Sequence, residues 1–174
     1  MWKKRLWRIF APLVMTILIC GAQTVVWPNL ISSLPAPPFW LLLIVWVSLY
    51  RNERETILLV YLMGLLATAF TAMPLKMMLF SLMILYVLIR RVKERVFWTG
   101  MPYFVMASAA SVTAFQVIYM ILSAVLEPTR TAWLPLDRLV VVLWSVPAAI
   151  LIYSLMTRVD QPSLDSSDRE RSYV

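Results

Sequence analysis

The sequence predicts an all-α membrane protein with about six transmembrane helices, on three observations. Of its 174 residues 61% are hydrophobic and the mean hydropathy is +0.79, which is more apolar than an ordinary soluble domain. Apolar runs close to helix length recur along the chain. Prolines and short blocks of charge separate these runs. We therefore expect one membrane domain over residues 1–157 and a disordered cytoplasmic tail over residues 158–174, which is rich in serine and charge.

The first two spans differ in length. Residues 9–27 follow a basic amino terminus and cover roughly 28 Å as a helix, enough to cross a bilayer. A cleaved signal peptide is the alternative, but its apolar core is usually shorter. We expect this helix to end at Trp27 and Pro28. Residues 39–50 cover only about 18 Å, so a re-entrant segment is the alternative to a short span anchored by Trp40 and Tyr50, with Arg51 snorkelling.

Four longer spans follow. They are residues 56–73, 75–89, 101–126 and 139–156. Pro74 separates the first two of these because proline interrupts helical hydrogen bonding. Asp137 is expected to cap the amino end of the last span, and Pro147 to kink it.

Small residues recur at helical spacing in two of the predicted spans. One row is Gly64, Thr68 and Ala72, and the other is Ala107, Ser111 and Ala114. Such rows let another helix approach closely, which drives helix association in lipid. Contact between the two helices of one hairpin needs only one such row, so we expect the other row to hold a partner helix.

Leucine at Gly64 or Ser111 should then leave the protein abundant in the membrane and lower recovery of the partner.

Basic residues predict the orientation. The densest cluster, Arg90, Arg91, Lys93 and Arg95, follows the fourth span and is expected to meet anionic lipid headgroups or an acidic partner. With an interior amino terminus, 13 of the 16 basic residues are cytoplasmic, and both termini lie in the cytoplasm. Nucleic acid is not expected as a partner, because the charge lies in blocks that flank apolar segments.

Missing residue types narrow the function. The chain has no histidine, one cysteine (Cys20), and no carboxylate in the middle of a predicted span, so we expect no enzyme, cofactor or metal site. A membrane scaffold and a binder of a small molecule remain. A binder would have few polar groups on the outer side, namely Gln23, Asn29, Glu127, Arg130 and Trp133.

Four motifs in a fixed order resemble the MreD family of rod shape-determining membrane proteins. They are Pro38-Phe39-Trp40-Leu41-Leu42-Leu43 with Trp46; Gly64-Leu65-Leu66 leading through Thr71 to Pro74-Leu75; Tyr86-Val87-Leu88-Ile89-Arg90-Arg91; and Leu143-Trp144-Ser145-Val146-Pro147. The resemblance implies a non-catalytic component of the bacterial cell-elongation and peptidoglycan synthesis machinery in the inner membrane. It also implies binding to an MreC-like membrane protein, beside an MreB-like filament and peptidoglycan synthases.

The family is also similar in fold to the substrate-binding subunits of energy-coupling-factor vitamin transporters. A small-molecule-binding subunit of such a transporter is therefore the alternative function that the resemblance implies.

Overall fold

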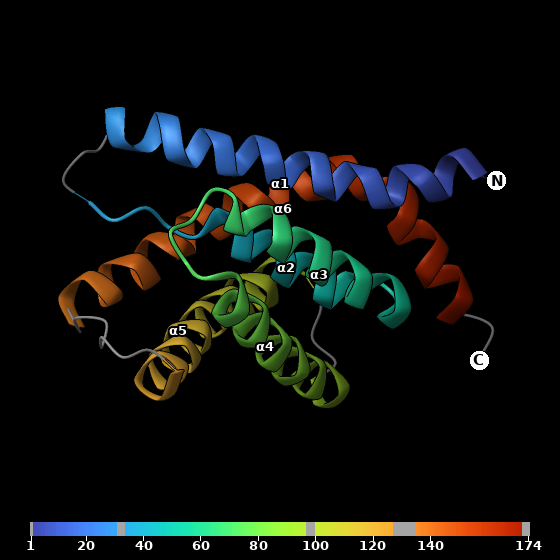
Figure 1. Cartoon of the computed structure of the whole chain (residues 1–174). Coiled ribbons are helices and arrows are strands. Elements are labelled where there is room, and N and C mark those ends of the chain that lie inside the picture. Colours follow the sequence, from blue (N-terminus) through green and yellow to red (C-terminus); the bar gives the residue numbers. More distant parts are fainter. Residues whose placement is uncertain (1, 31–33, 97–99, 127–134, 172–174) are drawn as a thin grey trace.

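The computed structural model describes the backbone of residues 2–30, 34–96, 100–126 and 135–171. These segments form helices connected by turns, and the predicted all-α fold is confirmed (Figure 1). The helices are α1 (Trp2–Leu30), α2 (Phe39–Tyr50), α3 (Glu53–Thr68), α4 (Leu75–Arg95), α5 (Met101–Leu126) and α6 (Pro135–Arg171).

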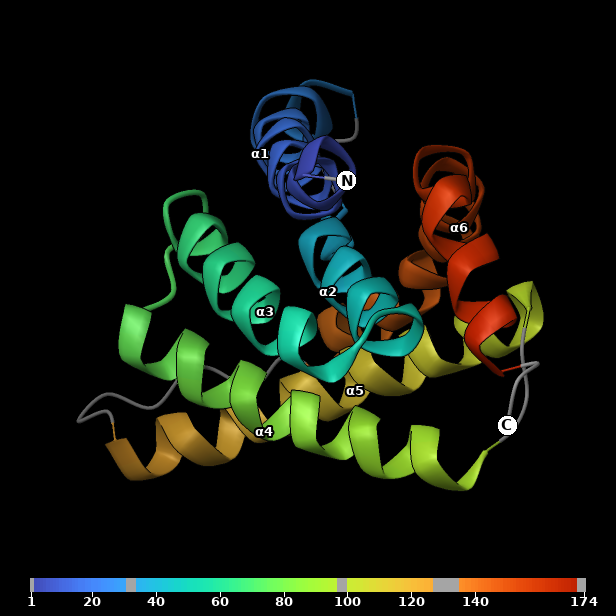
Figure 2. The same cartoon turned by 90° about the vertical axis from the view of Figure 1, so that its right-hand side faces the viewer.

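Helix α2 lies at the centre of the bundle. It contacts each of the other five helices, and these contact one another in the order α1, α3, α4, α5, α6, with α6 touching α1 again. Figure 2 shows this arrangement almost along α1, with α2 enclosed by its neighbours. The short second helix is thus the core around which the longer helices pack.

The composition of α2 explains its position. A helix that is apolar on all sides has no face suited to water and is buried. Every residue of α2 from Trp40 to Leu49 is buried. Trp40 is 3% exposed and packs edge-on against Phe115 of α5, with ring centroids 5.4 Å apart. Arg51, just after the helix, is 4% exposed. The predicted interface anchor at Trp40 and the predicted snorkelling of Arg51 are therefore wrong.

An aromatic cluster fixes the second half of α2 in the core. Trp46 is fully buried and packs against Tyr50 of its own helix, Phe104 of α5 and Tyr153 of α6. The ring centroids lie 4.2, 5.4 and 5.3 Å from that of Trp46, respectively, and the contacts with Phe104 and Tyr153 have the edge-to-face geometry of favourable aromatic pairs. Three helices therefore meet at one indole.

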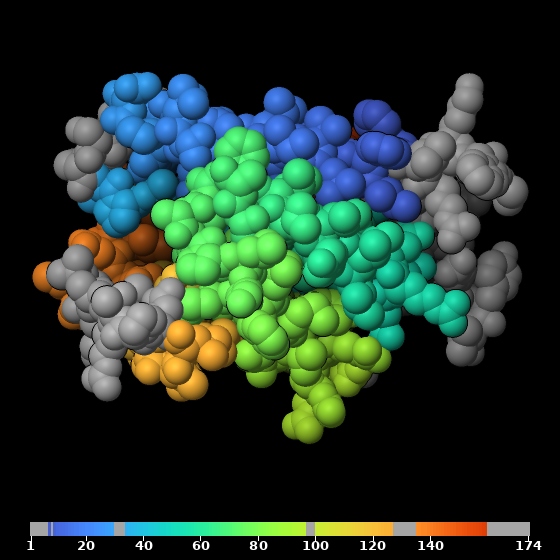
Figure 3. Space-filling model, viewed as in Figure 1, coloured from blue at the N-terminus to red at the C-terminus, as the bar shows by residue number. Residues whose placement is uncertain are grey.

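The outer helices show a membrane-embedded protein. Within the described residues, three stretches are long and apolar enough to cross a membrane, Ile9–Asn29, Met101–Leu126 and Pro135–Val159. Large apolar side chains are also exposed along α3 and α4, which form much of the face seen in Figure 3, among them Leu58, Leu65, Phe80, Ile84 and Val87. An exposed apolar surface of this extent is typical of a protein surrounded by lipid, and in water it would promote aggregation.

The helix bounds agree with the predicted spans in two cases and differ in four. Helices α2 and α5 cover the predicted residues 39–50 and 101–126. Helix α1 continues through Pro28 to Leu30, and the Asn29 side-chain amide donates to the Val25 carbonyl oxygen at 2.7 Å. Helix α3 ends at Thr68, whereas its span was predicted to end at residue 73. Helix α4 continues to Arg95, beyond the predicted end of its span at residue 89.

The last helix differs from prediction at both ends. It begins at Pro135, a residue favoured in the first helical turn, so Asp137 lies in that turn and does not cap the helix. It continues to Arg171, through most of the tail that was predicted to be disordered. Extending an existing helix costs less than nucleating one, because each added residue gains a hydrogen bond.

The structure places most charge at one end of the bundle. Residues 51–55, which connect α2 to α3 and form the first turn of α3, lie beside residues 90–95 at the end of α4, and we call this the charged end. At the opposite end, Trp27 of α1 packs against Phe39 of α2 and Trp144 of α6. Figure 1 shows the start of α1 and the last part of α6 on the same side as the end of α4.

Candidate functional site

Two residues of the predicted basic cluster hold the charged end together. Arg90 forms an ion pair with Glu53 of α3, 2.9 Å between Nη2 and Oε1, and a second with Glu94 of its own helix at 3.3 Å. Lys93 Nζ donates to the carbonyl oxygens of Ser48 and Arg51, at 3.5 and 3.3 Å. The positive charge of Lys93 also interacts favourably with the partial negative charge that the helix dipole places at the C-terminal end of α2.

Lys93→Met should lower the stability of the protein by about 1–2 kcal/mol, because the two carbonyls at the end of α2 lose a charged donor while the aliphatic stem is kept. The unfolding midpoint of the purified protein in detergent measures this. Lys76→Met is the matched control, since Lys76 is exposed at the start of α4. Equal midpoints for the two variants would show that the Lys93 contact contributes nothing.

The remaining basic residues of the cluster face outward. Arg91 and Arg95 are exposed, one helical turn apart on α4. The cluster predicted from the sequence is therefore two pairs with different roles. Arg90 and Lys93 join helices, whereas Arg91 and Arg95 are available to a ligand outside the protein.

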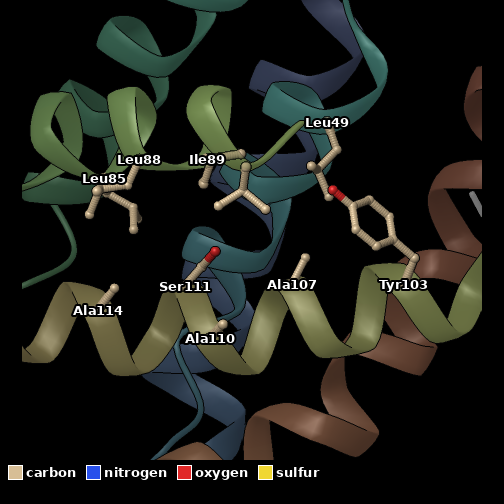
Figure 4. Close-up of a pocket in the computed structure, with 10 residues that line it drawn as sticks. Leu49, Leu85, Leu88, Ile89, Tyr103, Ala107, Ala110, Ser111 and Ala114 are labelled. Atoms are coloured by element: carbon tan, nitrogen blue, oxygen red, sulfur yellow. The ribbon is translucent and has the colours of Figure 1, made fainter. Parts of the chain in front are cut away.

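A groove of about 250 Å³ lies between α4 and α5, next to the charged end (Figure 4). Its lining is apolar except for two hydroxyl groups, and comprises Leu49, Leu85, Leu88, Ile89, Val92, Tyr103, Ala107, Ala110, Ser111 and Ala114. Figure 4 shows leucine and isoleucine side chains of α4 on one wall, small residues of α5 on the other, and Tyr103 with Leu49 at one end. Leu88 and Ala110 are exposed, so the groove opens to the outside.

The predicted small-residue row of α5 forms one wall of this groove. Ala107, Ser111 and Ala114 all line it, together with Ala110. The structure thus brings this row together on one surface that faces α4, where Ser111 is buried, Ala107 and Ala114 are half-buried, and Ala110 is exposed. A wall of small side chains leaves the backbone of α5 accessible to close approach.

The other predicted row packs internally. A Cβ atom added to Gly64 would lie 2.6 Å from Cδ1 of Leu82 in α4, so the space beside this glycine is already filled. Thr68 is the last residue of α3, and Ala72 lies beyond the helix in the turn before α4. The row is therefore a contact between α3 and α4, and Ala72 does not belong to it. The filled space beside Gly64 argues against the expectation that Gly64→Leu spares the fold, and the abundance of this variant in the membrane tests it.

The polar residues considered for a small-molecule site do not form one among the described residues. Gln23 has a buried Oε1 without a hydrogen-bond partner, and the Asn29 amide bonds to its own helix. Glu127, Arg130 and Trp133 lie outside the described residues. Within the described part of the chain, no three side chains of the types that bind metals come together.

Sequence reasoning missed the α4 wall of the groove and the two residues at its end, Leu49 and Tyr103. Leu49 comes from α2, whose burial brings it beside α4 and α5. The Tyr103 hydroxyl is buried and has no hydrogen-bond partner. The position of Tyr103, three residues after Gly100 at the start of α5, gives no signal of this, because the groove exists only once α4 and α5 pack together.

Comparison of the chain with protein-family models, curated proteins and solved structures finds no match. The groove and the charged end are therefore interpreted from their own geometry.

Proposed function

We propose that the chain is a non-catalytic membrane scaffold of the bacterial cell-elongation machinery. In this proposal it holds the transmembrane helix of an MreC-like partner, beside an MreB-like filament and peptidoglycan synthases. The motifs that resemble the MreD family support the cellular role. The observation that carries the binding role is the α4–α5 groove, because Ala107, Ser111 and Ala114 line it with the exposed Ala110, whereas the space beside Gly64 is filled.

A helix seated in the groove would gain packing against both walls. Lipid offers no hydrophobic drive for helices to associate, so close van der Waals contact has to supply it. The alanines and Ser111 of α5 allow the backbones to approach, and the larger side chains of α4 cover the partner from the other side. The site needs no catalytic group for this role.

The proposed location is the inner membrane, with several spans and both termini in the cytoplasm. The gathering of residues 51–55 and 90–95 at one end supports it, because cytoplasmic segments carry the excess of lysine and arginine. The small-molecule alternative has less support. A binding pocket for a polar ligand needs several convergent polar groups, and the groove offers only the hydroxyls of Tyr103 and Ser111.

Ala110→Leu should lower co-purification of the partner roughly tenfold, which corresponds to a loss of about 1.4 kcal/mol. Ala110 is exposed and lines the groove, so a leucine there separates the two backbones without entering the core. Recovery of the partner is measured by affinity purification and mass spectrometry at equal abundance in the membrane. Rod-shaped host cells should also become rounder.

The matched control is Ala124→Leu, because Ala124 is also exposed on α5 but does not line the groove. Partner recovery that is equal for Ala110→Leu, Ala124→Leu and the unmodified chain would rule out the groove as the partner site.

A further inference from the structure

We infer that, in the protein without a partner, one anionic phospholipid occupies the α4–α5 groove, with an acyl chain along the groove and its phosphate at Arg91 and Arg95. This goes beyond the proposed function and does not depend on it, since it concerns the chain alone. It defines what a partner helix would have to displace.

The groove suits an acyl chain. It is apolar along its length and opens to the outside at Leu88 and Ala110, on helices whose exposed faces are apolar. An unfilled groove would leave its lining without van der Waals contacts. In a bilayer the groove is surrounded by lipids, so a lipid acyl chain can supply these contacts.

The charge beside the groove selects the headgroup. Leu88 and Val92 line the groove, and Arg91 and Arg95 follow each of them by three residues on the same face of α4. Both arginines are exposed, while Arg90 and Lys93 already bind groups within the protein. Basic pockets between transmembrane helices at the cytoplasmic side are typical sites for anionic lipids, and guanidinium groups match the geometry of phosphate.

The Tyr103 hydroxyl provides an independent polar contact. It is buried and has no hydrogen-bond partner, and Figure 4 shows it at the end of the groove, pointing toward Leu49. A buried hydroxyl without a partner is costly, so a polar ligand atom at this end would offset that cost. Apolar walls, a hydroxyl at one end and two arginines beside them match a molecule with one anionic end and a long apolar chain.

The test uses the purified full chain in nanodiscs that contain equal amounts of phosphatidylglycerol and phosphatidylcholine. Native mass spectrometry then counts the lipids that stay bound after release. We expect one retained phosphatidylglycerol, preferred over phosphatidylcholine by roughly tenfold. Arg91→Gln combined with Arg95→Gln should abolish the preference, and Arg91→Lys with Arg95→Lys should keep most of it. Ala110→Leu should lower retention of both lipids, because leucine fills the groove.

Arg54→Gln is the control, because Arg54 is exposed at the charged end on α3 and does not line the groove. An equal loss of preference in this variant would show a general effect of charge and overturn the inference. Retention unchanged by Ala110→Leu would overturn it too, since the lipid would then be bound outside the groove. If the double glutamine variant does not fold, the lysine and Ala110 variants decide between these outcomes. Partner recovery in cells is a separate measurement, so either proposal can fail alone.

Discussion

Gly64→Leu should strongly reduce the amount of folded protein in the membrane. Even the first carbon of the new side chain would lie 2.6 Å from Cδ1 of Leu82, and Leu79 is 3.5 Å away, so leucine has no space between α3 and α4. Overpacking of this kind costs about 1–3 kcal/mol or more, and here it also separates two helices that contact α2. Membrane abundance and monodispersity after extraction in mild detergent measure the effect.

Gly21→Leu is the matched control, because a Cβ atom at Gly21 meets nothing within 4 Å. This variant should accumulate like the unmodified protein. Gly64→Ala should fall between the two, since the nearest atom belongs to the flexible end of Leu82 and can move. Normal abundance of Gly64→Leu would contradict the contact between α3 and α4 described above.

Trp46→Ala should lower the stability by about 3–5 kcal/mol, the usual cost of removing a large buried aromatic side chain. The cavity would open where α2, α5 and α6 meet, and it would remove the ring contacts with Phe104 and Tyr153. Unfolding of the purified protein, followed by loss of helical signal on heating or in denaturing detergent, measures the change.

Trp7→Ala provides the comparison, because Trp7 is 62% exposed on α1. It should shift the unfolding midpoint little. Similar shifts for the two tryptophan variants would mean that the aromatic cluster around α2 is not the stabilising core of the bundle.

The fold could be predicted from the sequence as far as local signals reach. Pro38 and the charged residues after Tyr50 bound α2, and Gly100 and Pro102 mark the start of α5, so both ranges agree with the structure. Pro28 failed as a stop signal because it lies in the last turn of α1. The uniform hydrophobicity of α2 predicts its central position, whereas Trp40 and Tyr50 at its ends are typical of a lipid interface, and this second signal is wrong for the buried Trp40.

The candidate site could be predicted only in part, because it depends on contacts between helices. Spacing alone identified two small-residue rows, but not that Leu82 fills the space beside Gly64 while the α5 row lines a groove. Spacing also identified the basic cluster. Which of its members bind within the protein depends on Glu53 and the end of α2, and folding brings these beside α4.

The central position of α2 has a consequence for biosynthesis. This helix is about 18 Å long, shorter than the roughly 30 Å hydrocarbon core of a bilayer, so lipid alone does not stabilise it across the membrane. Its cover includes Phe104, Phe115 and Tyr153, which the ribosome adds long after α2 itself. The nascent chain therefore carries a core segment that α1, α3 and α4 cover only in part until α5 and α6 have been inserted. A chain released after α4 would present that segment to membrane proteases. Burial of α2 is complete only when α6, the last helix to be synthesised, packs against it.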